Sequence, residues 1–197
     1  MSCPIQDSEI GKVCYLTVSE SDIPEGSTQR RGGLHTEAPN GFRYESKMKT
    51  AIEHHWGMGY AIGPDELHGG FFMANNIDNT CAVFNALVTD KSVIDSCGGI
   101  EHLRSFIGEP YNLKANELVW LTDRTPHEAL SQPKSGYRQF FRLVTSEISL
   151  WFEEHSTPNP KVSLPDFVQV IKGNKLLTDE KKVKHIWKSL NFNIRSN

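Results

Sequence analysis

The sequence predicts a mainly β protein with a few peripheral helices, and jelly-roll topology is the arrangement it favours most. Roughly eight short segments rich in β-branched and aromatic residues are separated by turn signals. Helical patterns are few, and strands do not alternate with helices as they do in βαβ folds. The 197 residues are enough for one domain with a sizeable core, which would bury roughly 70% of the unfolded surface.

In the N-terminal half, apolar or β-branched runs are divided by loops rich in proline and glycine. We expect residues 19–33 to form such a loop, with Arg30 and Arg31 near its end. If residues 34–37 form a strand, His35 and Glu37 point to the same face, because strand side chains alternate. Residues 44–55 are ambiguous, and the two runs from 69 to 88 predict a hairpin with a long polar loop. The strand candidates of this half are residues 12–18, 34–37, 56–62, 69–74 and 80–88.

The C-terminal half contains a short helix, two longer strands and a change of composition. The apolar residues of 99–107 fall at helical spacing, and a glycine and a proline follow them. We interpret residues 1–155 as the jelly-roll domain and residues 156–197 as a C-terminal strap and helix packed on that domain. The elements expected here are strands at 117–123 and 137–151, a short segment at 127–130, an edge strand at 168–171 and a helix at 178–190.

Composition argues against several classes of function. The formal net charge is -3, and no basic run is interleaved with aromatic residues, so we expect no nucleic-acid partner. No apolar run approaches the roughly 20 residues that span a bilayer, and the polar N-terminus does not resemble a secretory signal. The four scattered cysteines are typical of reduced thiols in a cytoplasmic protein. A small-molecule substrate is the default expectation, and the oligomeric state is left open.

Three residues have the types and spacing of a metal site. His35 and Glu37 stand at i and i+2, and His127 follows a proline at the end of an apolar strand. Two imidazoles and one carboxylate on one face of a metal leave open positions for substrate and oxygen. We therefore predict that His35, Glu37 and His127 are metal ligands.

Two arginines follow this histidine on the last long strand. Arg138 and Arg142 share a strand face with Phe140, because their spacing is even. A guanidinium on that face can hold a carboxylate through two parallel hydrogen bonds. The apolar neighbours of these arginines argue against full exposure of the strand.

These residues resemble the Fe(II)/2-oxoglutarate-dependent dioxygenase superfamily, whose cupin-like fold is a double-stranded β-helix. The resemblance lies in His35-x-Glu37 and in the stretch from Asp123 through Thr-Pro-His127 to Arg138 and Arg142. It implies Fe(II) on His35, Glu37 and His127, and 2-oxoglutarate on Arg138, with Arg142 as a second anion contact. It implies oxygen-dependent hydroxylation of a substrate, with no catalytic residues beyond the metal ligands. Glu37 stands where the family usually has aspartate.

Two alternatives remain open from the sequence. A cupin-like metalloprotein without a cosubstrate could use a rival ligand set, which comprises His55, Glu66, His68 and His127. A jelly-roll module that binds a ligand or partner without metal or catalysis is the second alternative.

Overall fold

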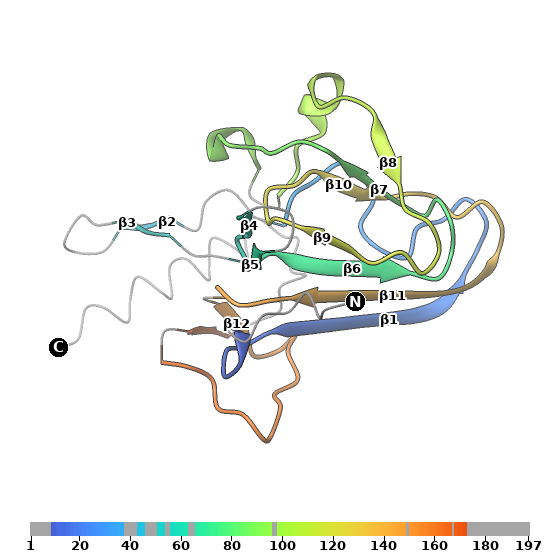
Figure 1. The fold of residues 1–197 in the computed structure, drawn as a ribbon. Helices are drawn as coiled ribbons and strands as arrows, with labels where there is room; N and C mark the ends of the chain where they lie inside the picture. The colour runs from blue at the N-terminus through green and yellow to red at the C-terminus, as the bar shows by residue number, and fades with distance from the viewer. Residues whose placement is uncertain are drawn as a thin grey trace. The chain divides into compact units, whose positions relative to one another are not determined.

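Figure 1 presents a computed structural model of the chain. The chain forms two compact units, Met1–Ile148 and Ser149–Asn197. The residues that the structure describes are 9–37, 43–45, 51–53, 56–62, 66–95, 98–148, 150–166 and 168–172.

The first unit is mainly β, with antiparallel sheets and very few helices among its described residues. Its larger sheet has four strands, in the order β1 (Tyr15–Ile23), β11 (Gly136–Val144), β6 (Phe71–Asn75) and β9 (Val119–Leu121). A three-stranded sheet has the order β10 (His127–Ala129), β7 (Cys81–Phe84) and β8 (Pro110–Asn112). All neighbours within both sheets are antiparallel. The mainly β prediction is thereby confirmed.

Smaller elements complete the described part of the chain. Two-stranded pairs are β2 (Arg43–Glu45) with β3 (Ala51–Glu53), and β4 (Tyr60–Ala61) with β5 (Leu67–His68). The short 3-10 helices are η2 (Lys91–Val93) and η3 (Glu101–Phe106), and η3 lies inside the helix predicted at 99–107. In the second unit, β12 (Leu150–Phe152) pairs in parallel with β13 (Gln169–Ile171). The helix predicted at 178–190 lies outside the described residues.

The two sheets of the first unit face each other across a shared interior. Figure 1 shows β1, β11, β6 and β9 side by side, with β7 and β10 over them. Arg138 on β11 donates a hydrogen bond to the sulfur of Cys81 on β7, and the ring of Phe71 on β6 lies 5.4 Å from that of His127 on β10. Side chains from both sheets therefore meet in this interior.

The first strand is longer than the sequence predicts. We expected residues 12–18, but β1 runs from Tyr15 to Ile23 and includes part of the expected loop. It pairs with β11 along its whole length, from Tyr15 opposite Val144 to Ile23 opposite Gly136. Strand preference depends strongly on the partner strand, and the long β11 holds the polar residues of β1 in the sheet.

The expected hairpin of residues 69–88 was wrong. Both strands exist, but β6 belongs to the four-stranded sheet and β7 to the three-stranded one. The turn between them is closed by the side chain of Asn75, whose Oδ1 accepts hydrogen bonds from Ile77 N–H and Thr80 Oγ1. This turn carries the chain from one sheet to the other, which places Phe71 and Cys81 on opposite sides of the interior.

In the part of the chain that the structure describes, no helix is long and apolar enough to cross a bilayer.

Candidate metal and anion site

His35 and His127 are brought together by their own backbones. The N–H of His35 donates to the carbonyl of His127 at 3.0 Å, and the N–H of His127 donates to the carbonyl of His35 at 2.9 Å. His35 also bridges to Gly99, so the strand expected at 34–37 is reduced to one bridging residue. The two imidazole centroids lie 4.5 Å apart, edge to face. Two histidines far apart in the sequence are therefore held as neighbours.

The hydrogen bonds of the two rings determine their tautomers. The Nδ1 atom of His35 lies 2.7 Å from Gly33 O, and the Nδ1 atom of His127 lies 2.9 Å from Thr125 O. A carbonyl oxygen only accepts, so each Nδ1 must carry the proton and donate it. In its neutral form, such a ring has its lone pair on Nε2. An imidazole with Nδ1–H on a backbone carbonyl is the arrangement that orients histidine ligands in metal sites.

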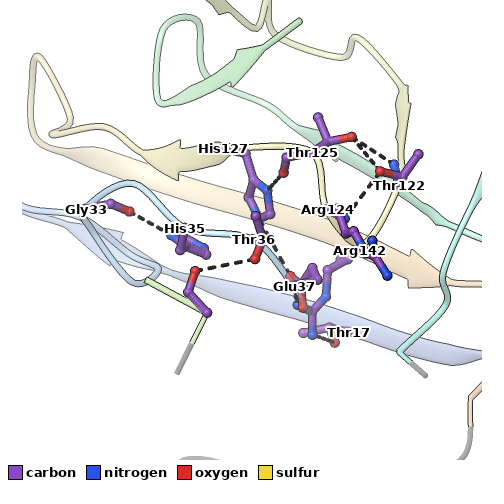
Figure 2. A network of polar contacts seen from close by, with 11 residues as sticks. Thr17, Gly33, His35, Thr36, Glu37, Thr122, Arg124, Thr125, His127 and Arg142 are labelled. Atoms are coloured by element: carbon purple, nitrogen blue, oxygen red, sulfur yellow. Dashed lines mark hydrogen bonds and ion pairs between the residues drawn. The ribbon is translucent and has the colours of Figure 1, made fainter. Parts of the chain in front are cut away.

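Glu37 lies against the second histidine and against β11. Its side chain is 10% exposed, and its Oε1 lies 3.7 Å from Nε2 of His127. The same oxygen accepts a short hydrogen bond from Nη1 of Arg142. Figure 2 shows His127 directed toward Glu37, with Arg142 against the same carboxylate. Of the three residues predicted as metal ligands, His127 therefore lies next to both of the others, with the ring of His35 on one contact and the carboxylate of Glu37 on another.

Burial sets the charge of nearby groups. Burial, and then the neighbouring His127, lowers the pKa of His35 to about 4, so this ring is neutral near pH 7. Burial raises the pKa of Asp123 to about 6, and the charge of Glu37 contributes in the same direction. Asp123 is 8% exposed and lies in the turn that leads to His127. The sequence placed Asp123 in the motif without predicting its burial.

Arg138 is a buried cation among neutral acceptors. Its side chain is 2% exposed and donates from Nε to Thr80 Oγ1, from Nη1 to Gln29 Oε1 and from Nη2 to Cys81 Sγ. Burial raises the pKa of the Cys81 thiol, although Arg138 opposes this shift. A neutral thiol is a weak acceptor. None of these three partners carries the negative charge that normally accompanies a buried guanidinium.

Arg142, which the sequence predicts as a second anion contact, pairs with a carboxylate of the chain itself. We expected a second anion contact, but its Nη1 pairs with Glu37 and its Nη2 donates to Thr17 Oγ1 at 3.4 Å. Thr17 is the residue directly opposite Arg142 on β1. Arg142 and His127 therefore both lie against Oε1 of Glu37.

Arg30 belongs to the same interior and was not among the predicted site residues. Its guanidinium carbon lies 5.2 Å from the ring centroid of Phe140, and that of Arg138 lies 5.4 Å from the same centroid. The loop position of Arg30, before two glycines, was visible in the sequence. Its direction into the sheet interior was not, because that depends on the path of the loop.

The structure describes three members of the rival ligand set, namely Glu66, His68 and His127. Nε2 of His68 contacts Oε1 of Glu66 at 2.9 Å, and its ring stacks on Tyr60 with centroids 4.8 Å apart. These contacts lie on the β4–β5 pair, and they do not involve His127. His55 lies outside the described residues.

The donor set of the first cluster has the chemistry of a metal site. His35 and His127 offer imidazole nitrogens, and Glu37 offers a carboxylate, which together suit Fe(II) or Zn²⁺. Over the described ranges, no three His, Cys, Asp or Glu side chains are already gathered tightly enough to form a metal-binding group. Glu37 is the member engaged elsewhere, through its bond to Arg142.

Fold and site together place this protein in a structural class: it is mainly β, with antiparallel sheets. Its His35–Glu37–His127 cluster lies beside β11, which carries Arg138 and Arg142 on its inner face. Comparisons with protein-family models, with curated proteins and with solved structures gave no match.

Proposed function

We propose that this protein is an Fe(II)/2-oxoglutarate-dependent oxygenase that hydroxylates a small molecule, with its two sheets arranged as a double-stranded β-helix. The observation that carries the proposal is the pairing of His35 with His127. Both rings have Nδ1 on a backbone carbonyl and Nε2 left for a ligand. The resemblance of the surrounding motif to that superfamily supports the choice of iron over other metals.

Each proposed role follows from the position of a side chain. His35, Glu37 and His127 would hold the iron, and Arg138 would hold the distal carboxylate of 2-oxoglutarate. When bound, iron and 2-oxoglutarate together supply oxygen activation for oxidising a C–H bond. The backbone carbonyls fix both imidazoles, Arg142 holds the carboxylate of Glu37 in place, and Phe71 covers one ring and helps to exclude water.

A cytoplasmic location is part of the same proposal. Cys14 and Cys81 are free thiols in the structure. Reduced thiols and a ferrous site are both maintained in a reducing compartment.

Anaerobic titration of the metal-free protein with Fe(II) and 2-oxoglutarate tests this function. We expect a metal-to-ligand charge-transfer band with the natural sequence and no band with His127→Ala. His102→Ala is the matched control, because His102 is exposed on η3, and it should keep the band. Absence of the band in the natural protein, or its persistence in His127→Ala, would refute the iron site.

The cosubstrate role of Arg138 has a separate test. Arg138→Gln should weaken 2-oxoglutarate binding by about tenfold or more, because a charge-assisted hydrogen bond is worth about 1.5–3 kcal/mol. Its affinity for Co(II), as a stable substitute for Fe(II), should stay unchanged. Equal 2-oxoglutarate affinity in both proteins would remove Arg138 from the role.

A second candidate function is a binding module for organic anions without metal. The Glu37–Arg142 pair favours it, because that pair satisfies the carboxylate without an ion. In this case the charge-transfer band is absent, and 2-oxoglutarate binds equally well with and without a chelator.

A further inference from the structure

The interior between the sheets carries more positive than negative charge. Arg30, Arg138 and Arg142 lie near one another there, and among the described carboxylates Glu37 is paired with Arg142 and lies near Arg30. Burial, and then the charge of Arg142, lowers the pKa of Arg30, with Glu37 opposing and Arg138 adding to this shift. Glu37 forms its ion pair with Arg142, and among the described residues the hydrogen bonds of Arg30 and Arg138 go to neutral side chains.

The guanidiniums of Arg30 and Arg138 both lie against the ring of Phe140. Arg138 and Phe140 stand at i and i+2 on the inner face of β11, and Arg30 approaches the same ring from the loop after β1. Gln29 ties the loop to the strand, since its Nε2 donates to the backbone carbonyl of Arg138 at 2.9 Å. Its Oε1 accepts from Nη1 of Arg138 at 2.8 Å. Gln29 therefore holds the loop that carries Arg30 against Arg138 and its strand.

The inner face of β1 is polar where it faces these arginines. Along β1 the less exposed positions alternate, and they include Thr17, Ser19 and Ser21. Ser19 Oγ accepts from Arg30 Nη1 at 3.3 Å, and Ser21 Oγ accepts from Gln29 Nε2 at 3.1 Å. The outward positions Leu16 and Val18 are instead apolar and more than half exposed. This inverted pattern is that of a strand lining a polar site rather than a hydrophobic core.

We propose that Arg30 and Arg138 bind one carboxylate group between them, beside the ring of Phe140, and that this pair makes the interior site selective for an organic acid. A bound carboxylate would supply the negative counter-charge for the buried cation of Arg138. The N–H groups of a guanidinium match the two oxygens of a carboxylate in geometry. The proposal rests on the anion site of the proposed function, and it names Arg30, instead of Arg142, as the second cation. It does not depend on the metal site.

Calorimetric titration of the chelator-treated, metal-free protein with glutarate tests the proposal. Glutarate has two carboxylates and lacks the 2-oxo group that would ligate a metal. Arg30→Gln should weaken glutarate binding by about tenfold or more, and Arg30→Lys, which keeps the charge but loses the planar fork, should weaken it less. Arg31→Gln removes the same charge from the neighbouring exposed position and should change the affinity by less than about twofold.

Three further measurements decide between the remaining outcomes. Glutarate affinity that is equal in Arg30→Gln and the natural protein overturns the proposal, as does tighter binding of inorganic phosphate than of glutarate. Circular dichroism confirms that each variant is folded, and Arg30→Lys supplies the test if Arg30→Gln is not. Co(II) titration separates the two proposals: glutarate binding that depends on Arg30 in a protein with no affinity for Co(II) upholds this inference and refutes the oxygenase.

Discussion

At the scale of single residues, the site depends on which atoms the backbone leaves available. Gly33 and Thr125 each offer a carbonyl to an imidazole, and both rings respond by placing the proton on Nδ1. Arg142 fixes Glu37 in the same way, through a charge-assisted bond. The positions of His35, Glu37 and His127 are thus determined by residues that would not themselves touch a metal.

The lowered pKa of His35 predicts a loss of stability in acid. Between pH 6.5 and about 4, the unfolded chain protonates this histidine and the folded chain does not, so stability falls as pH falls. The loss approaches about 3 kcal/mol at the low end of this window. His35→Asn removes this loss. The melting temperature of the variant minus that of the natural protein should therefore increase as the pH falls from 7 to 4.5. A difference in melting temperature that stays constant across this pH range would contradict the prediction.

Asp123 predicts the opposite dependence. Its pKa is about 6 in the folded protein against 3.8 in the reference state, so the folded chain holds the proton more tightly and gains stability as pH falls through this range. Asp123→Asn should therefore be more stable than the natural protein at pH 7, and the difference should shrink toward pH 4. Urea unfolding at both pH values measures it, and a constant difference would argue against the raised pKa.

Removing Arg142 should be costly because it leaves a buried charge unpaired. Arg142→Gln leaves Glu37, whose side chain is 10% exposed, without its cation, and we expect a loss of about 3 kcal/mol or more in the free energy of unfolding. Arg104→Gln is the control, because Arg104 pairs with Glu101 and Glu128 but its side chain is 42% exposed. That change should cost less than about 1 kcal/mol. Similar costs in both variants would contradict the buried pairing.

At the scale of elements, β11 organises the first unit. It pairs with β1 on one side and β6 on the other, and its inner face alternates Arg138, Phe140, Arg142 and Val144. Cross-strand register then places Thr17 opposite Arg142 and Ser21 opposite Arg138. One strand therefore supplies both Arg142, which supports Glu37, and Arg138, one of the two cations of the proposed anion site.

Close backbone contact near β6 predicts a strong effect of one glycine. Gly70 has φ +74°, and a Cβ there would lie 2.5 Å from Leu121 O and 2.7 Å from Trp120 Nε1. Gly26 has φ +76°, but an added Cβ meets no atom within 4 Å. We expect Gly70→Ala to lower the free energy of unfolding by about 3 kcal/mol or more and Gly26→Ala to lower it by about 1 kcal/mol. Both variants place a Cβ at a positive φ, but only the one at Gly70 also clashes with neighbouring atoms. Urea unfolding midpoints measure the difference, and equal midpoints would contradict the close contact.

At the scale of the whole molecule, the described site lies within one unit. The described site consists of His35, Glu37 and His127 together with Arg30, Arg138 and Arg142, and all of these residues belong to Met1–Ile148. The expected strand at 137–151 is divided accordingly, because β11 ends at Val144 and β12 begins at Leu150.

Residues 1–148 expressed alone should retain the site. We expect Co(II) and glutarate affinities within about threefold of the full chain, because the described contacts to the site come from this unit. Titrations of both proteins check this, with circular dichroism to confirm folding. A folded fragment that binds neither ligand, beside a full chain that binds both, would place part of the site in Ser149–Asn197.

The sequence by itself determined the mainly β class, the positions of several strands and the residue types of the candidate ligands. Alternation of apolar residues and turn signals are local, so they can be read without the fold. Only the tertiary structure decided that β6 and β7 enter different sheets, that Arg142 pairs with Glu37, and that Arg30 reaches Phe140. These contacts join residues distant in the chain, and their formation depends on strand register and loop path, which no local pattern encodes.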